Sequence, residues 1–182
     1  GGMKYSYLTS TNAVMLPVTT AGANADGLHD LGTASARFRD IYLSGAVYLG
    51  GTAAVNKLDN YEEAVWTPAQ AGVTLTVVRA RSVRVGNLVT ATCRLTWPSN
   101  SDSTAVYITG LPFVCTGTWE SSGSVMHQNA DTGSNTGLVA YKSITAAAVN
   151  VFSVGDDAAW AIPTNAQFSG AEIILTITYQ TP

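Results

Sequence analysis

The chain has 182 residues, a net charge of −3 and only 12% charged residues, about half the charged share of a typical soluble domain. Nucleic-acid binding is disfavoured because it requires clustered cations, and Lys142 is the sole Lys or Arg after Arg94. No apolar run reaches the ~18 residues of a membrane-spanning helix, so membrane insertion is not expected. Small polar residues are abundant instead, which favours an all-β fold or an interface between subunits.

The first region, residues 3 to about 60, follows Gly1 and Gly2, which we interpret as residues left over from expression. It consists of very short apolar segments separated by Gly, Asn and Ser. Between Ile41 and Leu49 these apolar residues alternate on either side of a Ser-Gly corner. Strands of two or three residues cannot bury a core by themselves, but neighbouring copies of the chain can supply one. We therefore expect a shaft that requires partner chains.

Residues 61–182 are expected to form a compact β-domain. Apolar and polar residues alternate from Val89 to Trp97 and again from Ile173 to Tyr179, as in half-buried strands. Weaker strand patterns lie at 73–79, 82–86, 104–109, 124–128, 137–144 and 148–154. The one candidate for a helical turn, 144–151, is rich in β-branched residues, which argue against it. Seven or eight regularly spaced strands predict a β-sandwich or a jelly roll.

Two cysteines, Cys93 and Cys115, lie far apart and have no CxxC partner. Cys93 continues the alternation of its strand, so we expect a small buried side chain there. A disulfide between the two cysteines is the alternative, and the sequence leaves it open.

The segment from Asp30 to Pro68, DLGTASARFRDIYLSGAVYLGGTAAVNKLDNYEEAVWTP, closely resembles the junction between the shaft and the head of bacteriophage tail fibres. The order and spacing of its elements are kept along almost the whole segment. Downstream, RVGNLVT (Arg84–Thr90) and ITGLPF (Ile108–Phe113) resemble the head domain that follows this junction. The sequence departs from the pattern at Ala64-Val65, where a Gly and another residue usually precede the aromatic residue.

This resemblance implies a homotrimeric virion protein, assembled in the host cytoplasm as part of a phage tail and acting at the host cell surface. Its shaft, residues 3–60, would continue from an upstream shaft and be intertwined. Its head, residues 61–182, would be a jelly-roll-like β-sandwich that binds a bacterial surface glycan or an outer-surface protein. The resemblance implies no cofactor.

Two histidines are candidates for metal binding or proton transfer. His127 is followed by Asp131, but two residues do not make a closed metal or catalytic site, and a solvated loop is the alternative. His29 would form a ring of three if it lay near a trimer axis, and such rings can hold ions. Neither pattern is sufficient to predict a metal site.

The paired acids also argue against catalysis. Glu62-Glu63 and Asp156-Asp157 are adjacent in the sequence, so within a strand the two members of a pair point to opposite faces. Glycosidases need two carboxyl groups about 5–10 Å apart across one bond. The sequence also has no GxSxG motif and no phosphate-binding glycine loop. We therefore predict no catalytic residue and no enzymatic activity.

Aromatic residues beside polar loops are the better candidates for a binding site. The group comprises Trp97, Trp119, Tyr141, Phe152 and Trp160. Sugar binding requires a flat apolar ring that stacks on C–H groups, with polar side chains nearby for the hydroxyls. The predicted receptor-binding residues are Trp119, Glu120, Tyr141, Asp156, Asp157 and Trp160. The alternative places these rings in the core or at a subunit interface; the core is expected for Trp97, and Trp66 is expected between shaft and head.

Arg37, Arg39 and Asp40 form a charged cluster within the predicted shaft. A receptor-binding patch is one interpretation. The interpretation we favour is an Arg–carboxylate pair between chains that sets the register of three identical strands.

Two other functions remain open. The head could act purely as a trimerisation or decoration domain of a virion protein, with adsorption carried out elsewhere. It could also be an enzymatic tip that trims surface polysaccharide. Blocking of phage adsorption by the purified chain separates binding from a purely structural role, and release of reducing ends would indicate the enzyme.

Overall fold

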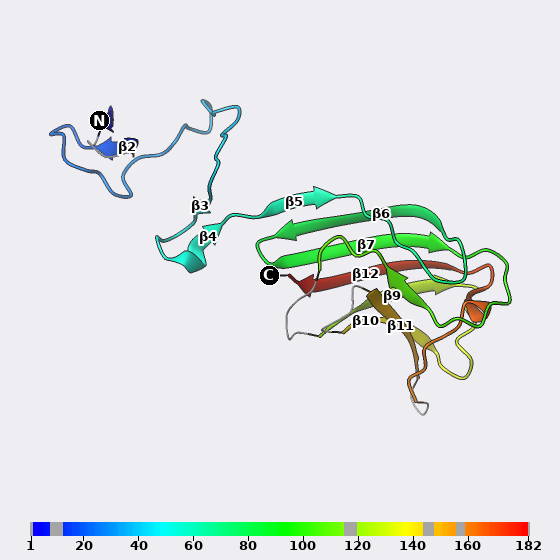
Figure 1. Ribbon diagram of the computed structural model, residues 1–182. Helices are drawn as coiled ribbons and strands as arrows, with labels where there is room; N and C mark the ends of the chain where they lie inside the picture. The colour runs from blue at the N-terminus through cyan, green and yellow to red at the C-terminus, as the bar shows by residue number, and fades with distance from the viewer. Residues whose placement is uncertain (1, 8–12, 115–119, 144–147, 156–158, 182) are drawn as a thin grey trace. The chain divides into compact units, whose positions relative to one another are not determined.

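The computed structural model describes residues 2–7, 13–114, 120–143, 148–155 and 159–181 (Figure 1). The chain separates into two compact units, Gly1–Ser44 and Gly45–Pro182. The functional boundary near residue 60 stays a prediction.

The first unit contains one antiparallel hairpin, formed by β1 (Gly2–Tyr7) and β2 (Ala13–Val18). These six-residue strands are longer than the very short segments expected. The expectation followed the apolar alternation, which is incomplete here, whereas the strands are defined by backbone pairing along their whole length. A tight turn follows, in which the Thr19 amide donates to the Ala23 carbonyl at 2.8 Å. Val18 and Ala25 are buried beside this turn.

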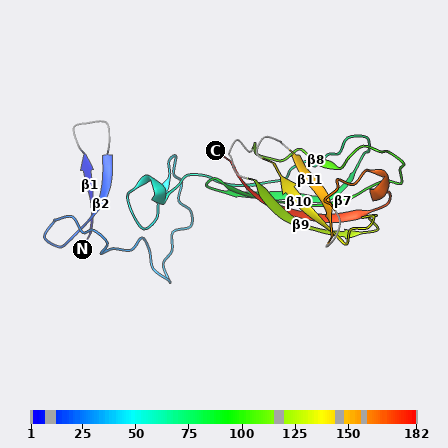
Figure 2. The ribbon, with the colours of Figure 1, turned by 90° about the horizontal axis from the view of Figure 1, so that it is seen from below.

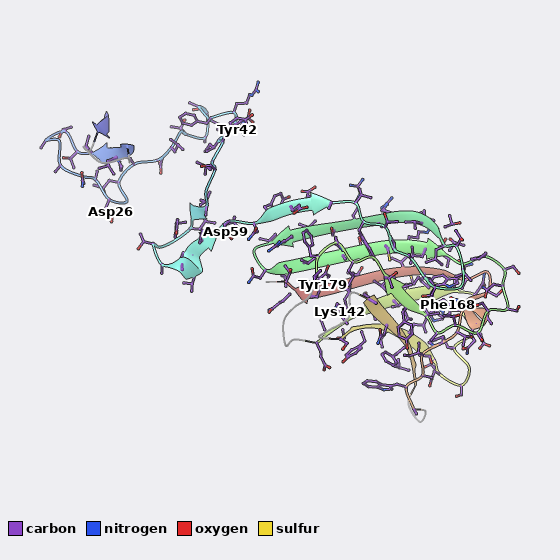
Figure 3. All side chains as sticks on the ribbon, in the orientation of Figure 1. Asp26, Tyr42, Asp59, Lys142, Phe168 and Tyr179 are labelled. Atoms are coloured by element: carbon purple, nitrogen blue, oxygen red, sulfur yellow. The ribbon has the colours of Figure 1, made fainter. Side chains whose placement is uncertain are left out.

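Residues 28–55 span the end of the first unit and the start of the second, and their large apolar side chains are exposed. Tyr42 is 90% exposed (Figure 3). The exposed large apolar residues of this segment are Leu28, Leu31, Phe38, Ile41, Tyr42, Leu43, Val47, Tyr48, Leu49 and Val55. Of the alternating stretch 41–49, only β3 (Val47–Tyr48) is a strand, and it pairs with β4 (Lys57–Leu58) after the 3₁₀ turn η1 (Ala54–Asn56). Within one chain this segment therefore has almost no core of its own.

The residues of the predicted head, which we call the head for short, form one curled antiparallel sheet, which contains eight strands in the described part of the chain (Figures 1 and 2). The strand order is β5-β6-β7-β12-β9-β10-β11-β8. The strands are β5 (Tyr61–Ala64), β6 (Thr76–Val85), β7 (Leu88–Thr96), β8 (Tyr107–Thr109), β9 (Ser121–Gln128), β10 (Gly137–Lys142), β11 (Ala148–Val154) and β12 (Glu172–Gln180). The fold class is therefore all-β, as the sequence predicted.

The segment that follows β5 bridges the two edges of this sheet. Ala69 and Thr109, which belongs to edge strand β8, exchange two backbone hydrogen bonds, at 2.8 and 3.2 Å. Beside them, Gln70 donates to the Ala105 carbonyl and accepts from the Tyr107 amide. These bonds hold the curl, because they join a segment near the β5 edge to the opposite edge.

The core lies on the inner face of the curl. Alternate residues of β7 and β12 are buried, as period-2 strands require. The Trp97 ring packs against Phe168 of the 3₁₀ turn η2 (Ala166–Phe168), with ring centroids 4.9 Å apart and ring planes tilted by 60°. Trp97, Phe168, Lys142 and Tyr179 are among the largest fully buried side chains, and the last three are labelled in Figure 3.

The strands predicted around Val89–Trp97 and Ile173–Tyr179 are confirmed as β7 and β12, which pair with each other. The separate patterns at 73–79 and 82–86 are one strand, β6, with an irregularity between Val77 and Arg79. Strand β5 was not predicted, because adjacent glutamates obscure its alternation. Of the candidate helical turn at 144–151, residues 144–147 lie outside the described residues and the rest is strand β11.

Candidate functional site

The candidate site begins with two neighbouring strands, β10 and β11. Leu138, Ala140 and Lys142 are buried on one face of β10, so Tyr141 projects from the other face, where it is half-buried. In β11, Phe152 is half-buried between buried neighbours in the same way. Asn150 is the direct register partner of Tyr141. The outer face of these strands therefore carries two rings and an amide.

A third ring extends this pair into a row. The Tyr141 and Phe152 ring centroids are 5.8 Å apart with an edge-on geometry of 69°. The Phe152 and Trp160 centroids are 6.1 Å apart and tilted by 58°. Trp160 is 72% exposed, and two backbone hydrogen bonds between Ser153 and Ala161 hold its segment beside β11. We call Tyr141, Phe152 and Trp160 the aromatic row.

Glu120 supplies a carboxylate to one end of the row. It lies just before β9, whose Ser122 is the register partner of Tyr141. The Tyr141 hydroxyl donates a short hydrogen bond to Glu120 Oε1. This bond to the carboxylate raises the pKa of Tyr141 above its ordinary value, so the phenol stays protonated and continues to donate at neutral pH.

The structure thus brings together three of the six residues proposed for receptor binding: Glu120, Tyr141 and Trp160. The other three, Trp119, Asp156 and Asp157, lie outside the described residues. Phe152 is the central ring of the row. It belongs to the group of aromatic residues beside polar loops but is not among the six residues predicted to bind a receptor. The predicted strand at 148–154 contained the signal, since Phe152 falls on the face opposite Val149 and Val151.

The two other tryptophans belong to the head core. Trp97 is 2% exposed, as predicted, and its indole donates to Asn165 Oδ1 at 3.0 Å. Trp66 is 4% exposed and packs in the same core, with its indole donating to the Thr92 carbonyl at 3.1 Å. Both indole N–H groups are therefore satisfied inside the head.

The arrangement suits a ligand with an apolar face and hydroxyl groups. An exposed indole and a half-exposed phenyl ring offer flat apolar surface for C–H groups. The Glu120 carboxylate can accept from hydroxyls, and the Asn150 amide can both donate and accept. Such a combination of rings with a few polar groups is typical of sites that orient small ligands or saccharide units.

In the charged cluster of the first unit, Arg39 pairs with its neighbour Asp40. Arg39 Nε lies 2.9 Å from Asp40 Oδ2, and the two side chains are 95% and 46% exposed. Arg37 is also exposed. Ser35, Arg37, Phe38 and Arg39 line a shallow, open depression. The pairing observed is within one chain, and the proposed pairing between chains stays a prediction.

The structure places the two histidines in different local surroundings. His29 Nε2 donates to the Val18 carbonyl at 3.2 Å. His127 is half-buried on the inner face of β9, and Asp131 Oδ1 accepts from the Gly133 amide at 2.8 Å in a turn. Within the described residues, no group of three or more His, Cys, Asp or Glu could hold a metal ion.

Cys93 is a free, buried thiol in β7. Burial raises its pKa to about 12, so the thiol is uncharged and unreactive at neutral pH. Cys115 lies outside the described residues. The expectation of a small buried apolar side chain at Cys93 is confirmed.

In the described part of the chain, no helix has both the length and the apolar character required to cross a membrane. Comparison of the chain with protein-family models, with curated proteins and with solved structures gave no match.

Proposed function

We propose that this chain is the shaft end and head of a phage tail fibre, a homotrimeric, non-enzymatic protein of the virion tail. Its jelly-roll-like head attaches the virion to a glycan or protein on the bacterial surface. The observation that carries the binding function is the aromatic row with Glu120 at its end. Rings exposed on a rigid sheet, beside a carboxylate and an amide, are a surface that saccharides recognise by stacking and hydrogen bonding.

The exposed apolar residues between 28 and 55 support the trimeric shaft. Monomeric proteins rarely expose so much apolar surface in one stretch. Leu31, Ile41 and Leu43 are each more than half exposed within a single chain. Association of three copies would bury such residues in a shared core, which gains roughly 25 cal/mol for each Å² of apolar surface removed from water.

A shallow site is compatible with this function because the fibre is multivalent. Three heads on one fibre, and several fibres on one particle, raise the overall avidity by roughly 10² to 10⁴ over a single site. The aromatic row therefore does not need to form a deep pocket.

The experiment is a binding assay of the full chain on an array of bacterial surface glycans, followed by inhibition of phage adsorption. Trp160→Ala removes the most exposed ring of the aromatic row, and we expect binding to fall about fivefold or more, since the loss of a stacking ring costs about 1–3 kcal/mol. Tyr61→Ala is the matched control, because Tyr61 is 65% exposed but lies in β5, at the far edge of the sheet. Equal binding by the wild type and Trp160→Ala would contradict the proposal.

The exposed apolar stretch also favours the second candidate, a purely structural trimerisation or decoration domain. The adsorption assay separates the two functions. A trimer that neither binds glycans or bacteria nor blocks adsorption indicates the structural role.

A further inference from the structure

The half of the sequence that contains the aromatic row is strongly one-sided in charge. Residues 95–182 contain a single Lys or Arg, Lys142, and six acids: Asp102, Glu120, Asp131, Asp156, Asp157 and Glu172. Lys142 follows Tyr141 directly and so projects from the opposite face of β10, where it is fully buried. Its Nζ donates to the Ser143 carbonyl at 2.6 Å. Lys142, the one cation in this half of the sequence, therefore lies on the face of β10 opposite the aromatic row.

The arginines of the sheet are distant from the row. Arg79, Arg81 and Arg84 lie in β6 and Arg94 lies in β7, and strand β12 separates β7 from β9, the strand that Glu120 directly precedes. At about 4.8 Å per strand, β7 lies roughly 10 Å and β6 roughly 14 Å from β9, and both separations exceed the Debye length of about 8 Å at physiological salt. Arg94 is in addition paired with Glu172 at 2.9 Å. These cations do not neutralise the charge of Glu120.

Glu120 has acceptor capacity left for a ligand. Its Oε1 accepts from the Tyr141 hydroxyl, but an ionised carboxylate has two oxygens and about four lone-pair positions. Glu120 is exposed, so the remaining positions are open to solvent. The faces of the neighbouring rings carry a negative electrostatic potential, which attracts cations.

We propose that the aromatic row and Glu120 select glycans by charge: they bind saccharides that bear a free amino group, tolerate uncharged saccharides, and reject saccharides that bear carboxylates. This inference rests on the proposed glycan-binding function. The ammonium group of an amino sugar would contact the Glu120 carboxylate while the ring C–H groups stack on the row. An anionic sugar at the same place would meet the carboxylate without a compensating cation.

The test uses three sets of oligosaccharides with one β-1,4-linked glucose-type backbone: chitosan oligomers with free amines, uncharged cello-oligosaccharides, and cellouronate oligomers with carboxylates. The full chain is titrated with each set at low salt and at physiological salt. We expect the amine set to bind about two- to tenfold more tightly than the uncharged set, and the carboxylate set to bind most weakly. Salt should reduce the difference.

Three variants connect this order of affinities to the site. Glu120→Gln keeps the shape and an acceptor for Tyr141 but removes the charge, so the ratio of amine to uncharged affinity should fall towards one. Glu62→Gln makes the same change on β5, at the other edge of the sheet, and should keep the wild-type ratio. Tyr141→Phe keeps the ring and frees Glu120 Oε1, so the amine preference should persist.

The outcomes distinguish the two proposals. Binding that Trp160→Ala abolishes, but with carboxylate oligomers equal to or tighter than amine oligomers, overturns the charge selection and leaves glycan binding standing. An amine preference unchanged in Glu120→Gln also overturns it. If none of the three sets and no glycan of a broad bacterial array binds, both the glycan-binding function and the charge selection are overturned, because the chain then has no glycan-binding site.

Discussion

At the scale of single residues, one buried polar network holds the loops at one end of the head. Asn165 is fully buried; its Oδ1 accepts from the Trp97 indole, and its Nδ2 donates to the Ala71 carbonyl and to Asp102 Oδ1, both at 2.8 Å. Asp102 Oδ1 also accepts from the Thr104 amide at 2.9 Å. One amide side chain therefore ties its own loop to the loop that contains Ala71 and to the loop that contains Asp102. Without Asn165 the buried polar groups that bind it would lack a hydrogen-bond partner.

This network makes part of the stability dependent on pH. The hydrogen bond from Asn165, followed by those from Thr104, lowers the pKa of Asp102 below the ordinary value of 3.8. A carboxyl with a lowered pKa in the folded state contributes stability above its unfolded pKa, and this contribution is lost as the pH falls through the folded pKa.

We therefore predict that Asp102→Asn is less stable than the wild type at neutral pH and that the difference shrinks on acidification below about pH 4. The asparagine keeps an oxygen that accepts both bonds but cannot titrate. Urea unfolding from pH 7 to pH 2 measures the difference. A difference that stays constant over this range would show that Asp102 acts through geometry and not through its charge.

At the scale of elements, a glycine sets the close approach of β9 and β12. Gly123 is the register partner of Ile177, and a Cβ at position 123 would lie 2.1 Å from the Thr176 carbonyl oxygen. The two strands cannot move apart here without breaking the backbone hydrogen bonds between β9 and β12, because Ile177 is fully buried on the same side of the sheet. This pairing joins the β5-β6-β7-β12 half of the sheet to the half that carries the aromatic row.

We predict that Gly123→Ala destabilises the head by about 1–3 kcal/mol, the usual cost of overpacking, and also weakens ligand binding. Gly137→Ala is the control in neighbouring β10, since its nearest contact would be the Val154 side chain at an ordinary 3.9 Å. Chemical denaturation of both variants gives the comparison. Equal stability of the two would show that the β9–β12 pairing can relax.

At the scale of the whole molecule, the exposed apolar stretch leads to a prediction about assembly. Leu43 is 58% exposed within one chain, so in a monomer Leu43→Glu would change the stability by no more than about 0.5 kcal/mol. In an intertwined trimer the same change places three charges in a shared core. We therefore expect the wild type to have about three times the mass of the 19.0 kDa chain and Leu43→Glu to dissociate.

Light scattering with size-exclusion chromatography measures both masses. Ser35→Glu, at an exposed polar position of the same region, is the control and should keep the mass of the wild type. A wild-type mass equal to that of one chain would remove the basis of the shaft proposal.

Thermal unfolding of the Arg39→Ala trimer tests the register hypothesis. The exposed Arg39–Asp40 pair contributes little within one chain, so a lower melting temperature of the variant trimer would indicate that Arg39 has a partner in another chain, and an unchanged melting temperature would contradict the hypothesis.

The all-β class and the two central strands follow from the sequence alone. In β7 and β12 the alternation of apolar and polar residues is local, and the burial of every second residue follows from it directly. The sequence also singled out the aromatic and acidic residues from which the candidate site is built. The same local rule missed β5 and the β1–β2 hairpin, where backbone pairing exists without regular alternation.

Only the tertiary structure decided how these residues meet. Glu120, Tyr141 and Trp160 are far apart in the chain, and they are brought together by the registers of β9, β10 and β11 and by the bridge between Ser153 and Ala161. Alternation along a strand shows which of its faces is buried, but it does not identify the partner strand, because the pairing is made by backbone hydrogen bonds between segments that are distant in the sequence. The same pairing turned Lys142 into the core and left the aromatic row with a carboxylate as its neighbour.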